Sequence, residues 1–280
     1  MSFTVVGPMA HEVQSADRIE LVQPFLGMSE EEFRKLATSV MALVIHRTYE
    51  GINGKTTDAM GLWAKCDTPV ARLEDPFSGF IEVTRAGMAR TFLQYVKDRP
   101  QVEYLCMMDS DEAVPWDAPY KLAQWGKDIV SGVVCSNSER KGGIFACFTV
   151  KDKYGISRFP SVTNTKFMPT KGLIEAEHAG TGLLCVHKRV FEAIAASGDY
   201  PFFIPEEVRR HSAATGSLKL GEDMAFSEQA RRLGFKTYVD LSVRAPHYKV
   251  QAIQWFPKYL DDSLDCRDWQ VSTEDGTPAS

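Results

Sequence analysis

The residue types that could do chemistry gather at three distant places in this sequence. Asp109 and Asp111 directly follow the apolar run 104–108, Asp223 stands at the start of a predicted helix, and His247 follows the last predicted strand. Carboxylate oxygens suit Mg2+ or Mn2+, and a neutral imidazole can complete a shell that carboxylates begin. A carboxylate can also act as a general base. We therefore expect a cation site with an acid–base group, provided that the fold brings these places together.

The acidic pair is the strongest of these signals. Asp109 and Asp111 are two residues apart, and in an extended segment residues i and i+2 point the same way, so both carboxylates can face one ion. Two like charges at that spacing are costly without a compensating cation or solvent. The alternative is an ordinary turn that ends a strand, because Asp and Ser are common turn residues. The flanking apolar strand, the helix after Pro115 and the second strand at 129–134 favour a site that holds a metal and a diphosphate.

Asp223 and His247 are weaker signals when each is considered by itself. Asp223 has two interpretations: a helix cap, since acids are favoured at helix starts, or a base that takes a proton from an attacking hydroxyl group. His247 lies at a strand end, where sites of α/β proteins collect their ligands. Lys249 could balance the charge of a diphosphate.

Helices and strands alternate along most of the chain. Residues 29–32 have the Ser-x-x-Glu spacing of a capping box, and the run 104–108 is apolar throughout, as in a strand that is buried on both faces. The pattern predicts an α/β fold with a mixed, mostly parallel sheet flanked by helices, in a single main domain. Strands are expected at 40–45, 104–108, 129–134, 144–150, 182–186 and 236–241, and helices at 30–38, 84–98, 115–125, 188–196 and 223–233. We divide the chain into an N-terminal extension with a short helix (1–37), a catalytic domain (38–250) and a C-terminal segment with an acidic tail (251–280).

Composition excludes several classes of protein. The chain has 280 residues, of which 44% are hydrophobic and 25% charged, as in ordinary globular proteins. It contains no apolar run long enough for a membrane span, and residues 1–27 lack the pattern of a signal peptide. The six cysteines form no Cys-x-x-Cys pair and mostly lie in apolar runs, which predicts buried thiols and a cytoplasmic location. The net charge of −5 resides in residues 261–280, so the rest of the chain is neutral and shows no basic field for nucleic acid.

Taken in order, these segments resemble the nucleotide-sugar-dependent glycosyltransferases of the GT-A (Rossmann-like) fold, especially the family 2-like group. The resemblance extends over residues 40–249. It is carried by 42–49 (ALVIHRTY), 85–90 (RAGMAR), 105–111 (LCMMDSD), 180–186 (GTGLLCV), 221–226 (GEDMAF) and His247.

The resemblance implies a role for each matching residue. Asp109, Asp111 and His247 would hold Mn2+ or Mg2+ beneath the diphosphate of the donor, and Asp223 would be the base of an inverting transfer. The nucleotide-sugar donor would be bound by His46, Arg47, Thr48, Tyr49, Arg90, Ser110 and Lys249, with Arg85 as a further candidate. The acceptor side would be lined by Gly180, Thr181, Gly182 and Glu222, where missing side chains admit a sugar.

Two departures qualify the resemblance. The family's usual Pro-x-Tyr-Asn after the first strand is replaced here by the polar residues 46–50. Residues 251–255 (QAIQW) lack the arginine of the Gln-x-x-Arg-Trp processive motif, so we expect one sugar to be moved per encounter. A retaining mechanism stays open, because the sequence does not fix the side from which Asp223 approaches the donor.

Three questions remain open at this level. The same acids could serve a nucleotidyltransferase, although residues 51–55 are a poor imitation of its basic glycine-rich loop. The chain could also be a non-catalytic module that binds glycan or nucleic acid. The acceptor could be a glycan, a protein, a small molecule or, as a minority option, a modified base in DNA.

Overall fold

The computed structural model describes residues 4–6, 27–47, 52–75, 81–138, 143–151, 154–160, 171–204 and 221–248. The chain divides into two compact units, Met1–Tyr248 and Lys249–Ser280, and every described residue belongs to the first. Among the predicted site residues, Thr48, Tyr49 and Lys249 lie outside the described residues. His46 and Arg47 are described only as backbone.

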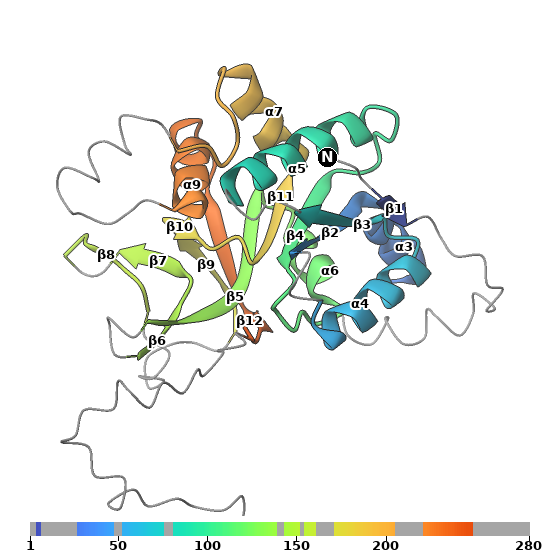
Figure 1. Cartoon of the computed structure of the whole chain (residues 1–280), viewed down its shortest axis with the longest axis horizontal. Helices are drawn as coiled ribbons and strands as arrows, with labels where there is room; N and C mark the ends of the chain where they lie inside the picture. Colours follow the sequence, from blue (N-terminus) through green and yellow to red (C-terminus); the bar gives the residue numbers. More distant parts are fainter. Residues whose placement is uncertain are drawn as a thin grey trace, which may run out of the picture. The chain divides into compact units, whose positions relative to one another are not determined.

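The first unit is built around a mixed β-sheet (Figure 1). Its strands lie in the order β1 (Thr4–Val6), β3 (Val70–Asp75), β2 (Val40–Arg47), β4 (Tyr104–Asp109), β11 (Leu183–His187), β5 (Ile129–Ser138), β12 (Thr237–Ala245) and β9 (Leu173–Ala176), and β6 (Gly143–Ala146) pairs with β5. Strands β3, β2, β4, β5 and β12 run in one direction, because β11 is antiparallel to both β4 and β5. The predicted fold class, a mixed sheet with most strands parallel, is confirmed.

Helices cover both faces of this sheet (Figure 1). Helices α5 (Ile81–Val96), α7 (Lys188–Ala196) and α9 (Glu222–Arg232) contribute to one hydrophobic cluster, and α3 (Glu30–Ser39), α4 (Gly54–Lys65) and α6 (Ala118–Ala123) to the other. In β2, Met41 and Leu43 belong to the first cluster and Ala42 and Val44 to the second. The alternation follows from the two-residue period of a strand, and it explains why the central strands are apolar throughout.

A smaller three-stranded sheet stands beside α9. It consists of β10 (His178–Ala179), β7 (Phe148–Lys151) and β8 (Ser157–Arg158), in that order and with antiparallel pairing. Strand β7 overlaps the strand expected at 144–150, whereas β8 and β10 were not among the predicted elements. No helix among the described residues combines the length and the apolar character that crossing a membrane requires.

The structure also corrects several predicted elements. Residues 70–75 form β3 and residues 54–65 form the helix α4, neither of which was among the predicted elements. The helix expected at 115–125 is confined to Ala118–Ala123, whereas β12 continues to Ala245. The capping box is present as predicted: the Ser29 hydroxyl accepts from the Glu32 amide, and the Glu32 carboxylate accepts from the Ser29 amide.

Candidate functional site

The predicted acidic residues lie where β4 ends and the chain turns. Asp109 is the last residue of β4, and residues 110 and 111 form a turn. The Asp109 amide donates to the Gly182 carbonyl at 3.0 Å, which ties this turn to the start of β11. Because the strand has already ended, the extended geometry expected for residues 109–111 is replaced by a turn. The two carboxylates instead have different partners.

Asp109 is bound by a buried arginine. Arg85 on α5 is 3% exposed, and one of its terminal nitrogens lies 2.8 and 3.1 Å from the two carboxylate oxygens of Asp109. Its other terminal nitrogen lies 3.0 Å from a carboxylate oxygen of Glu222 on α9. Burial lowers the pKa of Arg85, but the charges of Asp109, Glu222 and Asp223 outweigh it, so the pKa is raised overall and the guanidinium stays charged. Arg85 thus joins β4, α5 and α9 at one point.

Asp111 instead contacts His247. A carboxylate oxygen of Asp111 lies 2.8 Å from His247 Nε2, and His247 Nδ1 lies 3.1 Å from the Cys135 carbonyl. A carbonyl only accepts, so Nδ1 carries a proton. Nε2 then faces a carboxylate, and this pair of groups needs either a second proton or a cation. The backbone segments that carry Asp111 and His247 are also joined, since the Tyr248 amide donates to the Asp111 carbonyl at 2.8 Å.

A third acid, Glu112, directly follows this turn and is buried. Glu112 is 1% exposed, and its Oε2 has no hydrogen-bond partner among the described residues. Burial, followed by the charges of Asp109 and Asp111, raises the pKa of Glu112 well above its ordinary value. A side chain on Gly182 would meet Glu112 Oε1 at 1.9 Å. The three acids therefore interact electrostatically, and the raised pKa favours the neutral form of Glu112.

The first turn of α9 supplies the remaining acids. Asp223 is half-buried, and its Oδ1 accepts from the Met224 amide at 2.7 Å. Burial and then the neighbouring charge of Glu222 raise the pKa of Asp223, while the Met224 amide and Arg85 oppose the rise. A carboxyl group with a raised pKa is a better proton acceptor at neutral pH than an ordinary aspartate. Asp223 is not the side-chain cap of this helix, because its bond is to the adjacent amide and Gly221 occupies the cap position.

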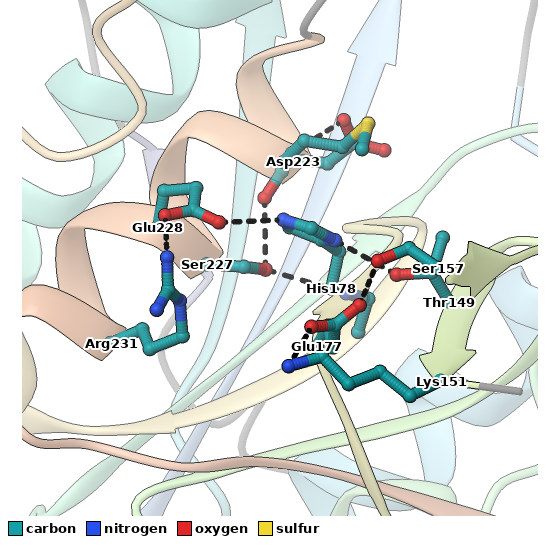
Figure 2. A network of polar contacts seen from close by, with 11 residues as sticks. Thr149, Lys151, Ser157, Glu177, His178, Asp223, Ser227, Glu228 and Arg231 are labelled. Carbon is teal, nitrogen blue, oxygen red and sulfur yellow. Dashed lines mark hydrogen bonds and ion pairs between the residues drawn. The ribbon is translucent and has the colours of Figure 1, made fainter. Parts of the chain in front are cut away.

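A polar network holds α9 against the smaller sheet (Figure 2). His178 on β10 lies 3.0 Å from Glu228 through Nε2 and 2.8 Å from the Thr149 hydroxyl through Nδ1. The Ser227 hydroxyl accepts from the Ala179 amide at 3.3 Å and donates to the Asp223 carbonyl at 3.1 Å. These bonds fix the turn of α9 that carries Asp223.

The residues predicted to line the acceptor side are packed against protein atoms. A side chain on Gly180 would meet the Cys147 Cβ at 2.8 Å, and Thr181 is 3% exposed. Gly180 and Gly182 thus allow segments of this chain to approach each other closely, which differs from the expectation that their missing side chains leave room for a sugar. Ser110 is also buried, and its carbonyl accepts from the Asn53 amide at 2.8 Å.

The predicted donor-binding residues are spread more widely. His46 and Arg47 are the last residues of β2, and their backbone pairs with Glu74 and Asp75 of β3 at the carboxyl edge of the sheet. Arg90 is exposed on α5 and lines a pocket beside α7, away from the residues that Arg85 contacts.

The side chains of Asp111 and His247 are of the kinds that bind a divalent cation. No group of three or more His, Cys, Asp or Glu side chains within the described ranges has the arrangement of a metal site, because Asp109 faces Arg85 while Asp111 faces His247. A carboxylate and an imidazole in contact nevertheless supply the kinds of donor atom that Mn2+ or Mg2+ takes. The site therefore joins Asp111 and His247 directly and leaves Asp109 with Arg85.

Sequence reasoning missed Glu112 and gave Arg85 only a minor place. Glu112 directly follows the acidic pair, so its position was visible, but its burial was not. Arg85 lies on the helix that motif matching had already singled out. An arginine in the first turns of a helix that packs on the sheet is a signal only when the facing strand ends in acids.

The structure is similar in part to two solved structures. The crystal structure of A197 from STIV matches with a TM-score of 0.45 and 17% identity, over 75% of this chain and 85% of that one. The crystal structure of GalNAc-T7 with UDP, GalNAc and Mn2+ matches with a TM-score of 0.42 and 10% identity, over 80% of this chain but 46% of the other. No protein-family model matches the sequence, and no curated protein matches it. Because both TM-scores are below 0.5, neither match indicates an activity for this chain.

Proposed function

We propose that this protein is a metal-dependent glycosyltransferase that moves one sugar from a nucleotide-diphosphate sugar to an acceptor hydroxyl. The observation that carries the proposal is that acids from β4 and α9 meet at the buried Arg85, while Asp111 contacts His247, at the carboxyl edge of the sheet. Ligands of open α/β sheets bind at this edge. The element order is also compatible with the GT-A fold that the sequence resembles.

Asp111 and His247 would hold the cation. A bound divalent cation supplies Lewis-acid stabilisation of the negative charge on a diphosphate leaving group. The contact of His247 Nδ1 with the Cys135 carbonyl directs Nε2 toward the site, which is the arrangement that prepares an imidazole for coordination. Asp109 supports the site through Arg85, which holds β4 and α9 together.

Asp223 is proposed as the base. Its raised pKa suits proton transfer from an acceptor hydroxyl, and the bonds of Ser227 fix its helical turn. The donor's base and ribose are assigned to His46, Arg47, Thr48 and Tyr49 at the end of β2, by resemblance. Glu222 stands beside Asp223 on the proposed acceptor side, bound to Arg85.

The proposal is tested by incubating the full chain with a panel of nucleotide sugars and Mn2+. We expect hydrolysis or transfer that releases a free nucleotide diphosphate and stops when EDTA is added. Asp111→Ala should abolish turnover while the protein stays folded. Asp98→Ala, at an exposed acid beyond the end of α5, should retain it.

Other outcomes would point to the rival functions. Release of pyrophosphate from a nucleoside triphosphate and a sugar phosphate would identify a nucleotidyltransferase. Saturable binding of a nucleotide sugar without turnover would identify a binding module. Full activity of a folded Asp111→Ala variant would remove the metal assignment.

A further inference from the structure

A pocket lies outside the acid cluster (Asp109, Asp111, Glu112, Glu222 and Asp223), between α5 and the turn that follows α7. Its volume is about 610 Å3, within the range of pockets that bind small organic molecules. Its walls are mostly apolar and include Val83, Ala86 and Leu93 from α5 and Ala195 from α7. Tyr200 and Phe203 close it on the side of the turn.

The turn that carries the two aromatic rings is held by a strained anchor. Phe202 has a φ of 67°, a left-handed conformation that is rare for a bulky residue. Its side chain is fully buried and stacks on Phe226 with ring centroids 4.3 Å apart. Strain of this kind persists only where the surroundings hold it in place, and it is concentrated at functional sites.

A buried glutamine fixes the same turn. Gln229 on α9 donates from Nε2 to the carbonyls of Tyr200 and Phe203 at 3.0 and 3.3 Å, and its Oε1 accepts from the Phe202 amide at 3.2 Å. Because Phe202 points into the core, the rings of Tyr200 and Phe203 are left 69% and 44% exposed. Their centroids lie 6.5 Å apart at an interplanar angle of 62°. The turn is therefore a rigid platform for two exposed rings.

The polar groups of the pocket are one cation and one anion. Arg90 and Asp199 both line it, and within the described part of the chain neither forms an ion pair or a hydrogen bond through its side chain. Opposite charges of this kind give the pocket no net preference for a charged ligand. A hydroxyl group can accept from the guanidinium and donate to the carboxylate, so it suits both.

We propose that this pocket binds a small, uncharged ring compound that carries hydroxyl groups. The apolar walls and the two exposed rings contact the body of the ligand, and Arg90 with Asp199 bind its hydroxyl groups. No residue of the acid cluster lines the pocket. The inference concerns binding alone and stands whether or not the proposed transfer activity is correct.

The test uses 2-naphthol as the probe, titrated into the full chain at pH 7 and followed by saturation-transfer NMR and fluorescence. We expect saturable binding that is weakened at least about tenfold by Tyr200→Ala, the scale for losing an aromatic contact in a pocket. Ala195→Phe, at an exposed position, should weaken it similarly by filling the pocket. Tyr154→Ala is the matched control, because Tyr154 is 73% exposed and does not line the pocket.

Three results would overturn the proposal. The first is no saturable binding of 2-naphthol to the wild-type protein. The second is equal affinity of the wild-type protein, the Tyr200→Ala variant and the Ala195→Phe variant, which would place the probe elsewhere. The third is tighter binding of naphthalene-2-sulfonate than of 2-naphthol, which would show that the pocket selects an anion. Thermal unfolding of each variant shows whether a loss of binding comes from the pocket or from unfolding. The Tyr200→Ala variant enlarges the pocket and the Ala195→Phe variant fills it, so the two test the same pocket by opposite changes in volume.

Discussion

Replacing Arg85 with methionine tests whether the acid cluster depends on one buried cation. The substitution keeps an unbranched side chain of similar length and removes only the charge and its hydrogen bonds. Asp109 and Glu222, which bind Arg85 at 2.8 and 3.0 Å, would then lose their shared partner. They would also repel each other and the neighbouring Asp223.

The size of the effect follows from the geometry of the two ion pairs. With charge centres about 4 Å apart and an effective dielectric constant of about 20, each pair contributes about 4 kcal/mol of Coulomb energy. Burying the guanidinium costs several kcal/mol, which offsets part of that sum. The carboxylates of Asp109 and Glu222 are 31% and 19% exposed, so water screens them in part. We expect the free energy of unfolding to fall by about 3 kcal/mol, which corresponds to about 6–12 °C in Tm.

The assay is urea unfolding at pH 7, with Arg189→Met as the matched control. Arg189 forms an ion pair with Asp128, but its side chain is 55% exposed, and exposed pairs contribute less than about 1 kcal/mol. An Arg85→Met variant as stable as the Arg189→Met variant would refute the view that Arg85 holds the cluster together.

Three further predictions follow from individual side chains. Asp223→Asn should lower turnover at least about 100-fold with little change in donor affinity. Because the pKa of Asp223 is raised in the folded protein, its ionised form costs stability above that pKa and costs nothing below the ordinary value of 3.8, so the Asn variant should be more stable at pH 7 and unchanged at pH 3 in thermal unfolding. Gly182→Ala should cost about 1–3 kcal/mol in urea unfolding, because the new Cβ overlaps a buried carboxylate, whereas Gly61→Ala, with open space around it, should be neutral or stabilising. His178→Phe should cost about 1–3 kcal/mol by leaving a buried threonine hydroxyl unsatisfied, and wild-type stability in the same assay would contradict the role of the network in Figure 2.

Local patterns determined the central strands and most helices. The run 104–108 is buried on both faces as predicted, because only a strand between two layers of helices can hide consecutive apolar residues. The helix at 188–196 and the capping box at 29–32 depend on neighbours within one turn, so the sequence alone specifies them. The fold class followed from the alternation of these elements.

Strand β3 shows where local pattern is insufficient. Residues 70–75 mix apolar and charged side chains within six positions, and no period distinguishes them from a loop. Their strand form depends on parallel pairing with β2 and antiparallel pairing with β1, which are contacts between segments far apart in sequence. Residues 173–179 became β9 and β10 for the same reason.

The candidate site also depends partly on the local sequence and partly on tertiary contacts. The sequence by itself determined which residues could do chemistry, since residue types and strand ends identified Asp109, Asp111, Asp223 and His247. Only the tertiary structure decided which groups meet: Asp109 binds a buried arginine on α5, and Asp111 binds His247 across 136 positions. The physical reason is that hydrogen bonds and ion pairs act over about 3 Å, so the partner of each carboxylate is set by the packing of helices on the sheet and by no pattern along the chain.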